Sequence, residues 1–518
     1  MAPNVDVSLG SWFARRAAAT PDRPAISFEG TTRTYAQFLD RVDRLAAGLR
    51  AGGVSHGDRV GFLGLNSPAF LEAMFAASRL GASFVPLNFR LTGPELAFII
   101  GDAGIHTLVA DGPHRAVADS VRPRVPVRRY LGADHVVADG WELLEDVIAS
   151  HRPITATEPI GDDEVAAIMY TSGTTGRPKG AMLTHGNLWW NNINALHTLD
   201  IVQDDVTLVV APLFHIGGLN VTTLVTWQKG GEVVLHRSFD PGACLEAIAG
   251  RDVTTMFAVP AMLLLMSQHP GFGEADLTSL RMVVCGGAPV PEALIKTYNG
   301  AGVPINQGYG LTETAPLVTF LTPEFALEKV GSAGRTPLFT EVRLAGAQGG
   351  VVVEPLARGE VCVRGPNVMK GYWNQPEATA AAIDSEGWFH TGDLGYVDED
   401  GFLFIVDRVK DMVLTGGENV YPAEVEGALF QHPAVADVAV VGVPDERWGE
   451  TVVAVAVAKE NASLTLEDLR DVAGRSLARY KLPTRLEVVD ALPRNPAGKI
   501  LKFELRERLG AGPDTKRS

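Results

Sequence analysis

The sequence predicts an α/β protein, with a large N-terminal domain of stacked, mostly parallel sheets and helices and a small α+β C-terminal domain. The chain has 518 residues, more than one small core needs. Hydrophobic residues make up 46% and charged residues 20%, which disfavours disorder, collagen and coiled coil. Short apolar runs alternate with segments of helical periodicity, and this alternation favours parallel sheets.

The large domain shows the alternation most clearly. A helix is expected over residues 68–80, where apolar residues recur at helical spacing. Strands are expected at the short apolar runs 59–65, 83–87, 206–211, 232–235 and 281–285. No fixed-period repeat occurs, so a solenoid is not expected.

A change of rhythm near residues 398–401 marks the end of the large domain. There Asp-Glu-Asp-Gly indicates a hairpin turn, and a strand-like run at 402–406 and a charged segment at 407–411 follow it. We therefore expect a large domain over 1–407 and a small mobile domain over 408–518. In the small domain the sequence predicts a helix from Pro422, strands at 435–443, 450–458 and 485–489, and a helix after Thr465 whose apolar face continues to Tyr480.

Charge and cysteine content exclude several classes of protein. The chain has 45 Lys and Arg against 61 Asp and Glu, a net charge of −16, so nucleic-acid binding has little support. Cys244, Cys285 and Cys362 form no CxxC pair, which argues against a disulfide framework or a thiolate metal site. With no leader and no long apolar stretch, we expect a cytoplasmic protein without integral membrane association. Formation of a homodimer is left as an open alternative.

The strongest local signal is the segment 169–180, Met-Tyr-Thr-Ser-Gly-Thr-Thr-Gly-Arg-Pro-Lys-Gly, which follows a strand-like run. Its glycines let backbone amides approach an anion, its hydroxyls donate hydrogen bonds and Lys179 supplies a positive charge. Together these groups suit a polyphosphate. The spacing of a Walker A loop is absent, so a P-loop NTPase is not expected. A flexible surface loop is the alternative, and the length of the motif disfavours it.

A second segment, residues 307–314 (Gln-Gly-Tyr-Gly-Leu-Thr-Glu-Thr), combines glycines with a carboxylate. It does not match the dinucleotide-binding fingerprint G-x-G-x-x-G, because Glu313 stands where the last glycine is required. A carboxylate beside threonines suits Mg²⁺, which takes one or two carboxylates together with phosphate oxygens. Taken alone, the segment favours a turn over a metal site.

Six segments in this order resemble the core motifs of the adenylate-forming superfamily, which comprises acyl-CoA synthetases, peptide-synthetase adenylation domains and luciferases. The chain is most similar to the acyl-CoA synthetase branch. The segments are the two above and residues 388–393, 407–411, 416–419 and 493–499. The resemblance extends over essentially the whole chain. It implies that a carboxylate joins ATP to give acyl-AMP and pyrophosphate, after which a thiol displaces AMP.

The resemblance also implies where ATP and Mg²⁺ bind. The phosphate loop would hold the β- and γ-phosphates, Glu313 with Thr171 would hold the metal, and Lys499 would reach the carboxylate and the α-phosphate. The implied catalytic residues are Lys499, Glu313, Thr171, Lys179 and His215. The implied ATP contacts are Thr171, Ser172, Gly173, Thr174, Thr175, Gly176 and Lys179 at the phosphates, Gly286, Gly287, Ala288, Gln307, Gly308, Tyr309, Gly310 and Thr312 around the adenine, Asp393 and Arg408 at the ribose, and Lys499.

A rotation of the small domain between the two half-reactions is a further implication. Lys410 matches the family's pivot, and Gly416, Gly417 and Glu418 would line the entry of the thiol once Lys499 has left. A closed lid would keep water from the acyl-AMP. Coenzyme A is the expected thiol, because the long insertion of some carrier-loading relatives is not apparent. An acyl carrier protein is the alternative.

His215 lies in an apolar stretch, where a lone histidine is usually a hydrogen-bonded core residue. The family places an aromatic residue or a histidine here that closes over the carboxylate pocket. The sequence offers no carboxylate partner for acid–base catalysis. We therefore expect a binding role.

The expected acid pocket is apolar and built from small residues, with no Asp or Lys to meet an α-amino group. An amino acid is therefore disfavoured, and Gly217, Gly218 and Gly286 leave space. The main prediction is a medium- or long-chain fatty acid, in lipid metabolism. The alternatives are an aryl acid such as coumarate, ferulate or benzoate, or loading of a carrier protein. The pocket residues are His215, Gly218, Asn220, Val259, Gly286, Gly310, Leu311 and Leu317.

Two other classes of protein are weaker alternatives. A catalytically silent relative would be expected to have lost Glu313, Asp393 or Lys499, and all three are present. A luciferase would need an oxygen-handling site that the sequence does not indicate.

Overall fold

The computed structural model describes residues 6–134, 138–155, 159–171, 178–346, 350–408, 411–415, 418–445, 449–460, 462–494 and 500–510. The chain divides into two units. The first is Met1–Val342, Cys362–His390 and Gly401–Leu403, and the second is Arg343–Val361, Thr391–Asp400 and Phe404–Ser518. The predicted domain boundary between residues 407 and 408 stays a prediction.

The first unit contains two eight-stranded sheets, and one of them carries most of the predicted pocket residues. Its order is β15 (Leu317–Leu321), β14 (Ile305–Gly310), β13 (Met282–Gly286), β12 (Thr255–Ala258), β10 (Val206–Val209), β11 (Glu232–Leu235), β1 (Pro24–Phe28) and β2 (Thr31–Thr34). The strands from β14 to β1 run parallel, and only the edge strands β15 and β2 are antiparallel.

The other sheet carries the strands that flank the predicted phosphate loop. Its order is β19 (Gly371–Tyr372), β9 (Lys179–Thr184), β8 (Val165–Thr171), β4 (Ser83–Leu87), β3 (Arg59–Leu63), β5 (Thr107–Ala110), β6 (Arg129–Gly132) and β7 (Glu142–Leu143). It is parallel from β8 to β7, with antiparallel β9 and β19 at one edge. The predicted α/β class with stacked, mostly parallel sheets is confirmed.

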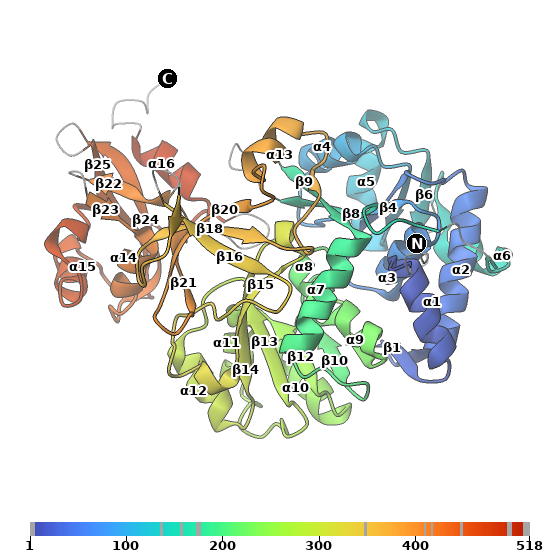
Figure 1. Cartoon of the computed structure of the whole chain (residues 1–518), viewed down its shortest axis with the longest axis horizontal. Coiled ribbons are helices and arrows are strands. Elements are labelled where there is room, and N and C mark those ends of the chain that lie inside the picture. Colours follow the sequence, from blue (N-terminus) through green and yellow to red (C-terminus); the bar gives the residue numbers. More distant parts are fainter. Residues whose placement is uncertain are drawn as a thin grey trace. The chain divides into compact units, whose positions relative to one another are not determined.

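Helices fill the space between the two sheets. An aromatic cluster of Phe13, Phe38, Phe75 and Trp227 joins α1 (Leu9–Ala19), α2 (Tyr35–Ala51), α3 (Pro68–Arg79) and α9 (Thr223–Lys229). Helix α7 (His185–Thr198) starts at a Thr184–Asn187 capping box and contacts β9 of one sheet and β15 of the other (Figure 1). This helix therefore links strand β9, which flanks the predicted phosphate loop, to the sheet that carries the predicted pocket residues. We call the latter the pocket sheet.

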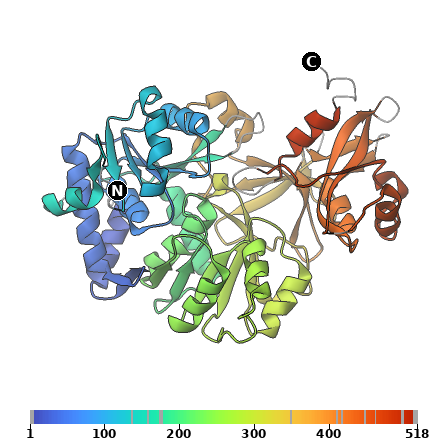
Figure 2. The ribbon, with the colours of Figure 1, turned by 180° about the vertical axis from the view of Figure 1, so that it is seen from behind.

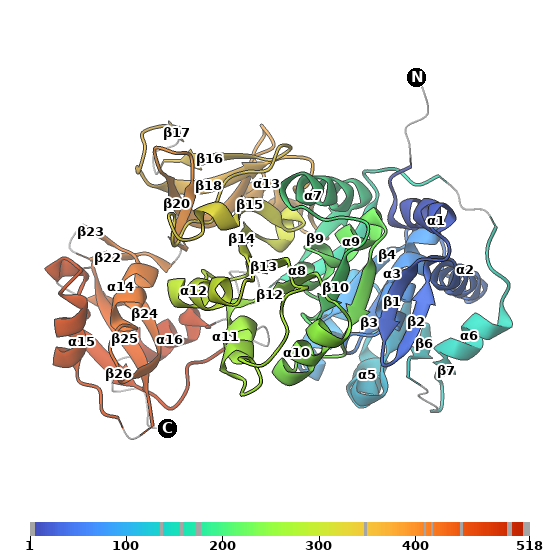
Figure 3. The same ribbon diagram turned by 90° about the horizontal axis from the view of Figure 1, so that it is seen from below.

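The opposite face of the pocket sheet carries α10 (Pro241–Gly250), α11 (Pro260–Gln268) and α12 (Glu292–Gly300). Figure 3 shows these helices on one side of the sheet and α7 and α9 on the other, and Figure 2 shows the same group, in yellow-green, from behind. The first unit also contains α4 (Gly93–Ala103), α5 (Arg115–Val121), α6 (Leu144–Ser150), α8 (Ile216–Asn220) and α13 (Pro376–Ala382). Among the described residues, no helix is both long enough and apolar enough to cross a membrane.

The second unit contains most of a five-stranded sheet and a smaller α+β body. The five-stranded sheet has the order β17 (Val351–Val352), β16 (Glu341–Ala345), β18 (Gly359–Arg364), β20 (Phe389–Val397) and β21 (Leu403–Arg408). The α+β body has a five-stranded sheet of its own, with the order β23 (Glu418–Val420), β22 (Val413–Thr415), β25 (Gly449–Ala458) and β24 (Val435–Asp445) and with β26 (Arg485–Val488) beside β25. This sheet packs with α14 (Pro422–Leu429), α15 (Leu466–Ala473) and α16 (Lys502–Gly510).

The predicted helix after Thr465 is shorter than its apolar face suggested. Helix α15 ends at Ala473, because the chain turns at Gly474 and Leu482 packs back into the core of the small sheet. Glycine is a poor helix former, which favours a stop at this position. Tyr480, which was expected on the buried face, is 45% exposed.

Candidate active site

The predicted pocket residues lie at the carboxyl ends of neighbouring parallel strands. His215 follows β10, Val259 follows β12, Gly286 ends β13 and Gly310 ends β14. The register pairs Gly286 with Gly308 across β13 and β14, so these ends meet at one edge of the sheet. This edge is the position at which open α/β sheets bind ligands.

Glu313 lies at the centre of a polar cluster. It sits in a short 3₁₀ turn, Thr312–Thr314, directly after β14, and is only 8% exposed. Its Oε1 accepts hydrogen bonds from the hydroxyls of Thr171 (3.2 Å) and Tyr372 (3.1 Å). The structure therefore brings together two predicted metal ligands, Thr171 and Glu313, although no sequence motif joins them.

Lys179 completes this cluster. It begins β9 and pairs with Thr171 across the hairpin that carries the phosphate loop. Its ammonium nitrogen lies 5.1 Å from the centre of the Tyr372 ring. Tyr372 was not predicted as a site residue. The one usable signal in the sequence was a glycine followed by two aromatic residues, in Lys370-Gly371-Tyr372-Trp373.

Buried asparagines hold the chain around Glu313. The Asn191 Oδ1 accepts from the Leu317 amide (3.0 Å), and the Asn220 Nδ2 donates to the Ala315 carbonyl (2.6 Å). The Asn367 Nδ2 donates to the carbonyls of Thr314 (2.9 Å) and Leu317 (2.8 Å). These side chains satisfy an irregular, buried stretch of backbone and so fix the position of the carboxylate. Asn191 was missed, although asparagines within an otherwise apolar helix were a usable signal.

His215 lies beside a small cavity of about 50 Å³, which Met169, Tyr170 and Thr312 also line. Burial, with a smaller effect from Arg90, lowers the pKa of His215 to about 4, so the ring is neutral near pH 7. The ring packs against Phe214 at 4.2 Å between centres. Among the described residues no carboxylate contacts the ring, which agrees with a binding role over acid–base catalysis.

The glycines of the pocket differ in the space that they leave. A Cβ at Gly218 would lie 2.5 Å from the Pro212 carbonyl oxygen, and one at Gly286 would lie 2.8 Å from the Gly308 carbonyl oxygen. These two glycines permit close backbone packing, and the expectation that they also leave room for substrate stays a prediction. At Gly308, which was predicted among the ATP contacts, the atoms nearest to an added Cβ belong to the Phe320 ring, at 3.6 Å, and to Val284, at 4.0 Å. These are ordinary van der Waals distances, so a methyl group would fit at Gly308 without moving the backbone.

The wall behind these strand ends is apolar. A buried apolar cluster that includes Phe257, Val284, Leu317 and Phe320 continues into α7. The Phe257 ring lies against Gly217, where an added Cβ would be 2.9 Å from it. Such a wall suits a hydrocarbon or aromatic group and disfavours an amino group.

The structure places the predicted adenine contacts, and among them Gln307 forms hydrogen bonds within the protein. The Gln307 side chain accepts from the Val290 amide at 2.9 Å and donates to the Ser332 carbonyl, so it ties the loop after β13 to β14. Gly287 has φ of +85°, a conformation that favours glycine, and Ala288 is exposed. Tyr309 is half-buried.

In the second unit, the remaining described residues of the motifs take part in local contacts. Asp393 is buried in β20, and its amide donates to the Thr391 hydroxyl (3.0 Å). The Asp407 carboxylate accepts from the Ala423 amide at the start of α14 (2.8 Å). The Asp411 carboxylate accepts from the Arg506 guanidinium on α16 (2.6 Å). The contacts of Asp407 and Asp411 join the predicted hinge segment to helices α14 and α16.

Several predicted residues lie outside the described residues. They are Ser172, Gly173, Thr174, Thr175, Gly176, Lys410, Gly416, Gly417 and Lys499, together with the side chains of Arg408 and Glu418. Their roles stay predictions.

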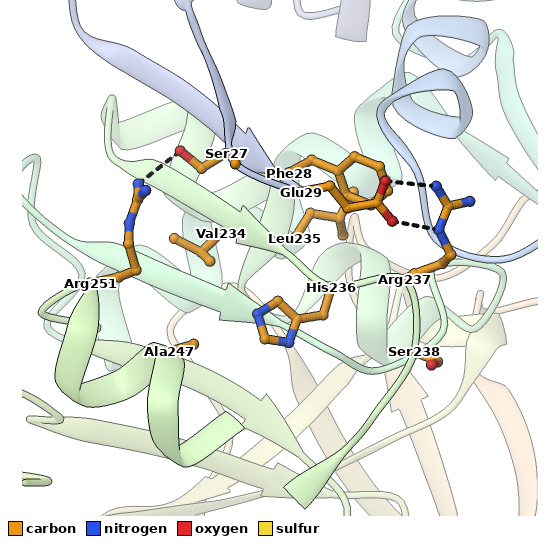
Figure 4. Close-up of a pocket in the computed structure, with 11 residues that line it drawn as sticks. Ser27, Phe28, Glu29, Val234, Leu235, His236, Arg237, Ser238, Ala247 and Arg251 are labelled. Atoms are coloured by element: carbon orange, nitrogen blue, oxygen red, sulfur yellow. Dashed lines mark hydrogen bonds and ion pairs between the residues drawn. The ribbon is translucent and has the colours of Figure 1, made fainter. Parts of the chain in front are cut away.

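A larger cavity, of about 450 Å³, lies away from this cluster (Figure 4). It is bounded by the ends of β1 and β11 and by α10, and none of the predicted site residues lines it. Its arginines are already paired, Arg237 with Glu29 (2.8 Å) and Arg251 with Ser27 (2.8 Å). Size alone therefore does not select a candidate site, and the Glu313 cluster is the candidate because it combines a carboxylate, a hydroxyl and a cation.

Comparisons with known proteins show the family of the chain. The profile of a family described as AMP-binding enzyme matches residues 13–373, and that of the AMP-binding enzyme C-terminal domain matches residues 424–499. A feruloyl-CoA synthase from Amycolatopsis sp is 48% identical over 97% of this chain and 99% of that protein. A long-chain-fatty-acid–CoA ligase from Mycobacterium tuberculosis is 41% identical over 96% of this chain and 98% of that protein. The solved o-succinylbenzoate coenzyme A synthetase from Bacillus subtilis, in complex with ATP and magnesium ion, is 35% identical over 95% of this chain and 98% of that chain, with a TM-score of 0.86.

Proposed function

Because the chain belongs to the AMP-binding enzyme family, in its acyl-CoA ligase branch, it is an acid–thiol ligase, and we propose that it activates an aryl acid of the ferulate type and transfers the acyl group to coenzyme A. The observation that carries the proposal is the Glu313 carboxylate held by the Thr171 hydroxyl beside Lys179. It provides a metal ligand and a cation at the base of a phosphate-binding loop.

The cluster fits Mg²⁺ and ATP by its donor chemistry. Both hydrogen bonds to Glu313 end on Oε1, and among the described residues no donor bonds Oε2, which leaves that oxygen for a hard cation. Bound Mg²⁺ would neutralise charge on the phosphates, where two anions must meet. Thr171 orients the carboxylate, and Lys179 adds a positive charge beside it.

The two half-reactions follow from the family. A carboxylate oxygen of the acid attacks the α-phosphorus of ATP, and pyrophosphate leaves with the bonding electrons. The thiol sulfur then attacks the acyl carbon, AMP leaves and the thiol proton is released. We assign Lys499 to the first step, with Asp393 and Arg408 on the ribose, and Lys410 to the pivot of the small domain. Gly416, Gly417 and Glu418 are assigned to the entry of the thiol.

The apolar wall supports an aryl acid. The rings of Phe257 and Phe320 belong to the buried apolar cluster behind the strand ends, and the Phe257 ring lies against Gly217, which suits a flat aromatic group at these ends. The 48% identity to a feruloyl-CoA synthase supports the aryl alternative better than the fatty acid that was the main sequence prediction. A fatty acid is the second candidate, favoured by the 41% identity to the long-chain-fatty-acid–CoA ligase.

Release of pyrophosphate with a panel of acids tests the proposal. The panel contains ferulate, coumarate, benzoate, decanoate and palmitate, each with ATP, Mg²⁺ and coenzyme A. We expect kcat/KM for ferulate to exceed that for either fatty acid at least tenfold. The reverse order would favour the fatty-acid candidate, and no release with any acid would reject both. Repeating the assay with a holo acyl carrier protein distinguishes the two thiols.

We also propose a cytoplasmic enzyme. The three cysteines, Cys244, Cys285 and Cys362, are buried and form no disulfide, which agrees with a reducing compartment. A thiol-reactive probe should label none of them in the folded protein, and all three after denaturation.

A further inference from the structure

Tyr372 contacts both charged groups of the phosphate cluster. Its hydroxyl donates to the Glu313 Oε1 at 3.1 Å, and its ring lies 5.1 Å from the Lys179 ammonium nitrogen. Among the described residues no ion pair joins Lys179 to Glu313, although both groups contact the same side chain. Tyr372 is therefore a contact that two opposite charges share.

The backbone around Tyr372 is hydrogen-bonded to strand β9, which begins at Lys179, and to the turn that contains Glu313. Strand β19 pairs with β9, with Tyr372 opposite Ala181, and the Trp373 amide donates to the Gly180 carbonyl (2.8 Å). The Met369 amide donates to the Glu313 carbonyl (2.8 Å). Tyr372 is thus held at a fixed distance from the strand of Lys179 and from the turn of Glu313.

A direct Lys179–Glu313 pair would be unfavourable for the proposed chemistry. It would neutralise the carboxylate and compete with a metal ion for its oxygens. A hydroxyl donor stabilises the buried carboxylate without cancelling its charge, and an aromatic face holds an ammonium group by a cation–π contact. One tyrosine provides both interactions.

We propose that Tyr372 is a positioning residue, which orients the Glu313 carboxylate for Mg²⁺ and keeps the Lys179 ammonium available for the phosphates of ATP. This inference rests on the proposed function and adds to it a residue that the sequence motifs did not indicate. It predicts that the hydroxyl and the ring of Tyr372 have separable effects on nucleotide binding.

Calorimetric binding of ATP, measured with Mg²⁺ and with EDTA, tests this role without any turnover. In Tyr372→Phe the ring remains, so we expect about tenfold weaker binding of MgATP, the effect of one hydrogen bond to a charged group, and a change below twofold in EDTA. In Tyr372→Leu the ring is lost as well, and we expect binding to weaken under both conditions. Adding Tyr372→Phe to Glu313→Gln should cause no further loss.

Tyr35→Phe is the matched control. The Tyr35 hydroxyl is buried and donates to the Gly231 carbonyl at 2.6 Å, away from the cluster. This control should lower the melting temperature and leave ATP binding unchanged. Equal weakening of ATP binding in Tyr372→Phe with and without Mg²⁺, or no weakening at all, would overturn the positioning role. If wild-type protein binds MgATP with this dependence on Tyr372 but activates no acid, the proposed function fails and the positioning role stands.

Discussion

The hydroxyl of Thr171 donates to the carboxylate of Glu313 across 3.2 Å, although the two residues are 142 positions apart in the chain. Thr171 ends a strand of one eight-stranded sheet, and Glu313 follows a strand of the other. The contact therefore lies where the two sheets of the first unit approach each other. Four predictions follow from this site and from its surroundings.

Replacing Thr171 by valine should reduce acid-dependent pyrophosphate exchange by roughly tenfold to a hundredfold, the order of effect expected for one positioned donor. Valine keeps the branched shape that suits a strand and removes only the hydroxyl. Thr171→Ser keeps the hydroxyl and should remain within about threefold of wild type. Equal rates in the two variants would show that the hydroxyl has no role.

Gly308 and Gly310 offer a matched pair of substitutions two residues apart. A Cβ at Gly308 meets only side-chain atoms at 3.6 Å or more, whereas one at Gly310 would lie 1.7 Å from the Pro316 carbonyl oxygen. Gly308→Ala should therefore fold normally and raise the KM for ferulate more than the KM for benzoate.

Gly310→Ala should instead lower the melting temperature and the activity with every acid, because backbone atoms must move. Melting curves and kcat/KM for the two acids check both variants. If Gly308→Ala affected ferulate and benzoate equally, Gly308 would not line the distal part of the pocket.

His185 should make the protein sensitive to acid. It is 1% exposed, its Nδ1 accepts from the Leu9 amide (3.3 Å), and burial lowers its pKa from 6.5 to about 4. Between these values the unfolded chain binds a proton that the folded chain does not, so stability falls as the pH decreases through this window. The loss is roughly 2 kcal/mol at pH 5.

His185→Asn replaces the accepting nitrogen by an amide oxygen and has no such titration. Urea unfolding at pH 7 and pH 5 gives the free energy of unfolding for each protein. The wild type should lose about 2 kcal/mol more than the variant over this interval. Equal losses would mean that His185 is not buried in its neutral form.

Substitutions of Lys499 and of Lys410 should each slow a different half-reaction. Lys499→Ala should abolish formation of acyl-AMP and retain thioester formation from supplied acyl-AMP, because we assign this lysine to the first step only. Lys410→Pro should spare the first step and slow the second, because it stiffens the hinge. Separate assays of pyrophosphate release and of thioester formation measure the two steps. Loss of both steps in either variant would contradict this division.

Much of the architecture could be predicted from the sequence. Strands 83–87 and 232–235 are found exactly where their apolar runs predict them, because a strand buried on both faces must be continuously apolar. The motifs at Thr171 and Glu313 identified the superfamily because their residue types are dictated by phosphate and metal chemistry. The choice between an aryl and a fatty acid could not be made in this way, since both need only an apolar wall.

What the sequence determined by itself was local: which segments form helices and strands, and which residue types can hold a polyphosphate. Only the tertiary structure decided that Tyr372 contacts both Lys179 and Glu313, that Gly218 lies against the Pro212 carbonyl and that a methyl group would fit at Gly308. The physical reason is that these contacts join residues far apart in the chain. Their distances depend on how helices and sheets pack, and no local periodicity records that packing.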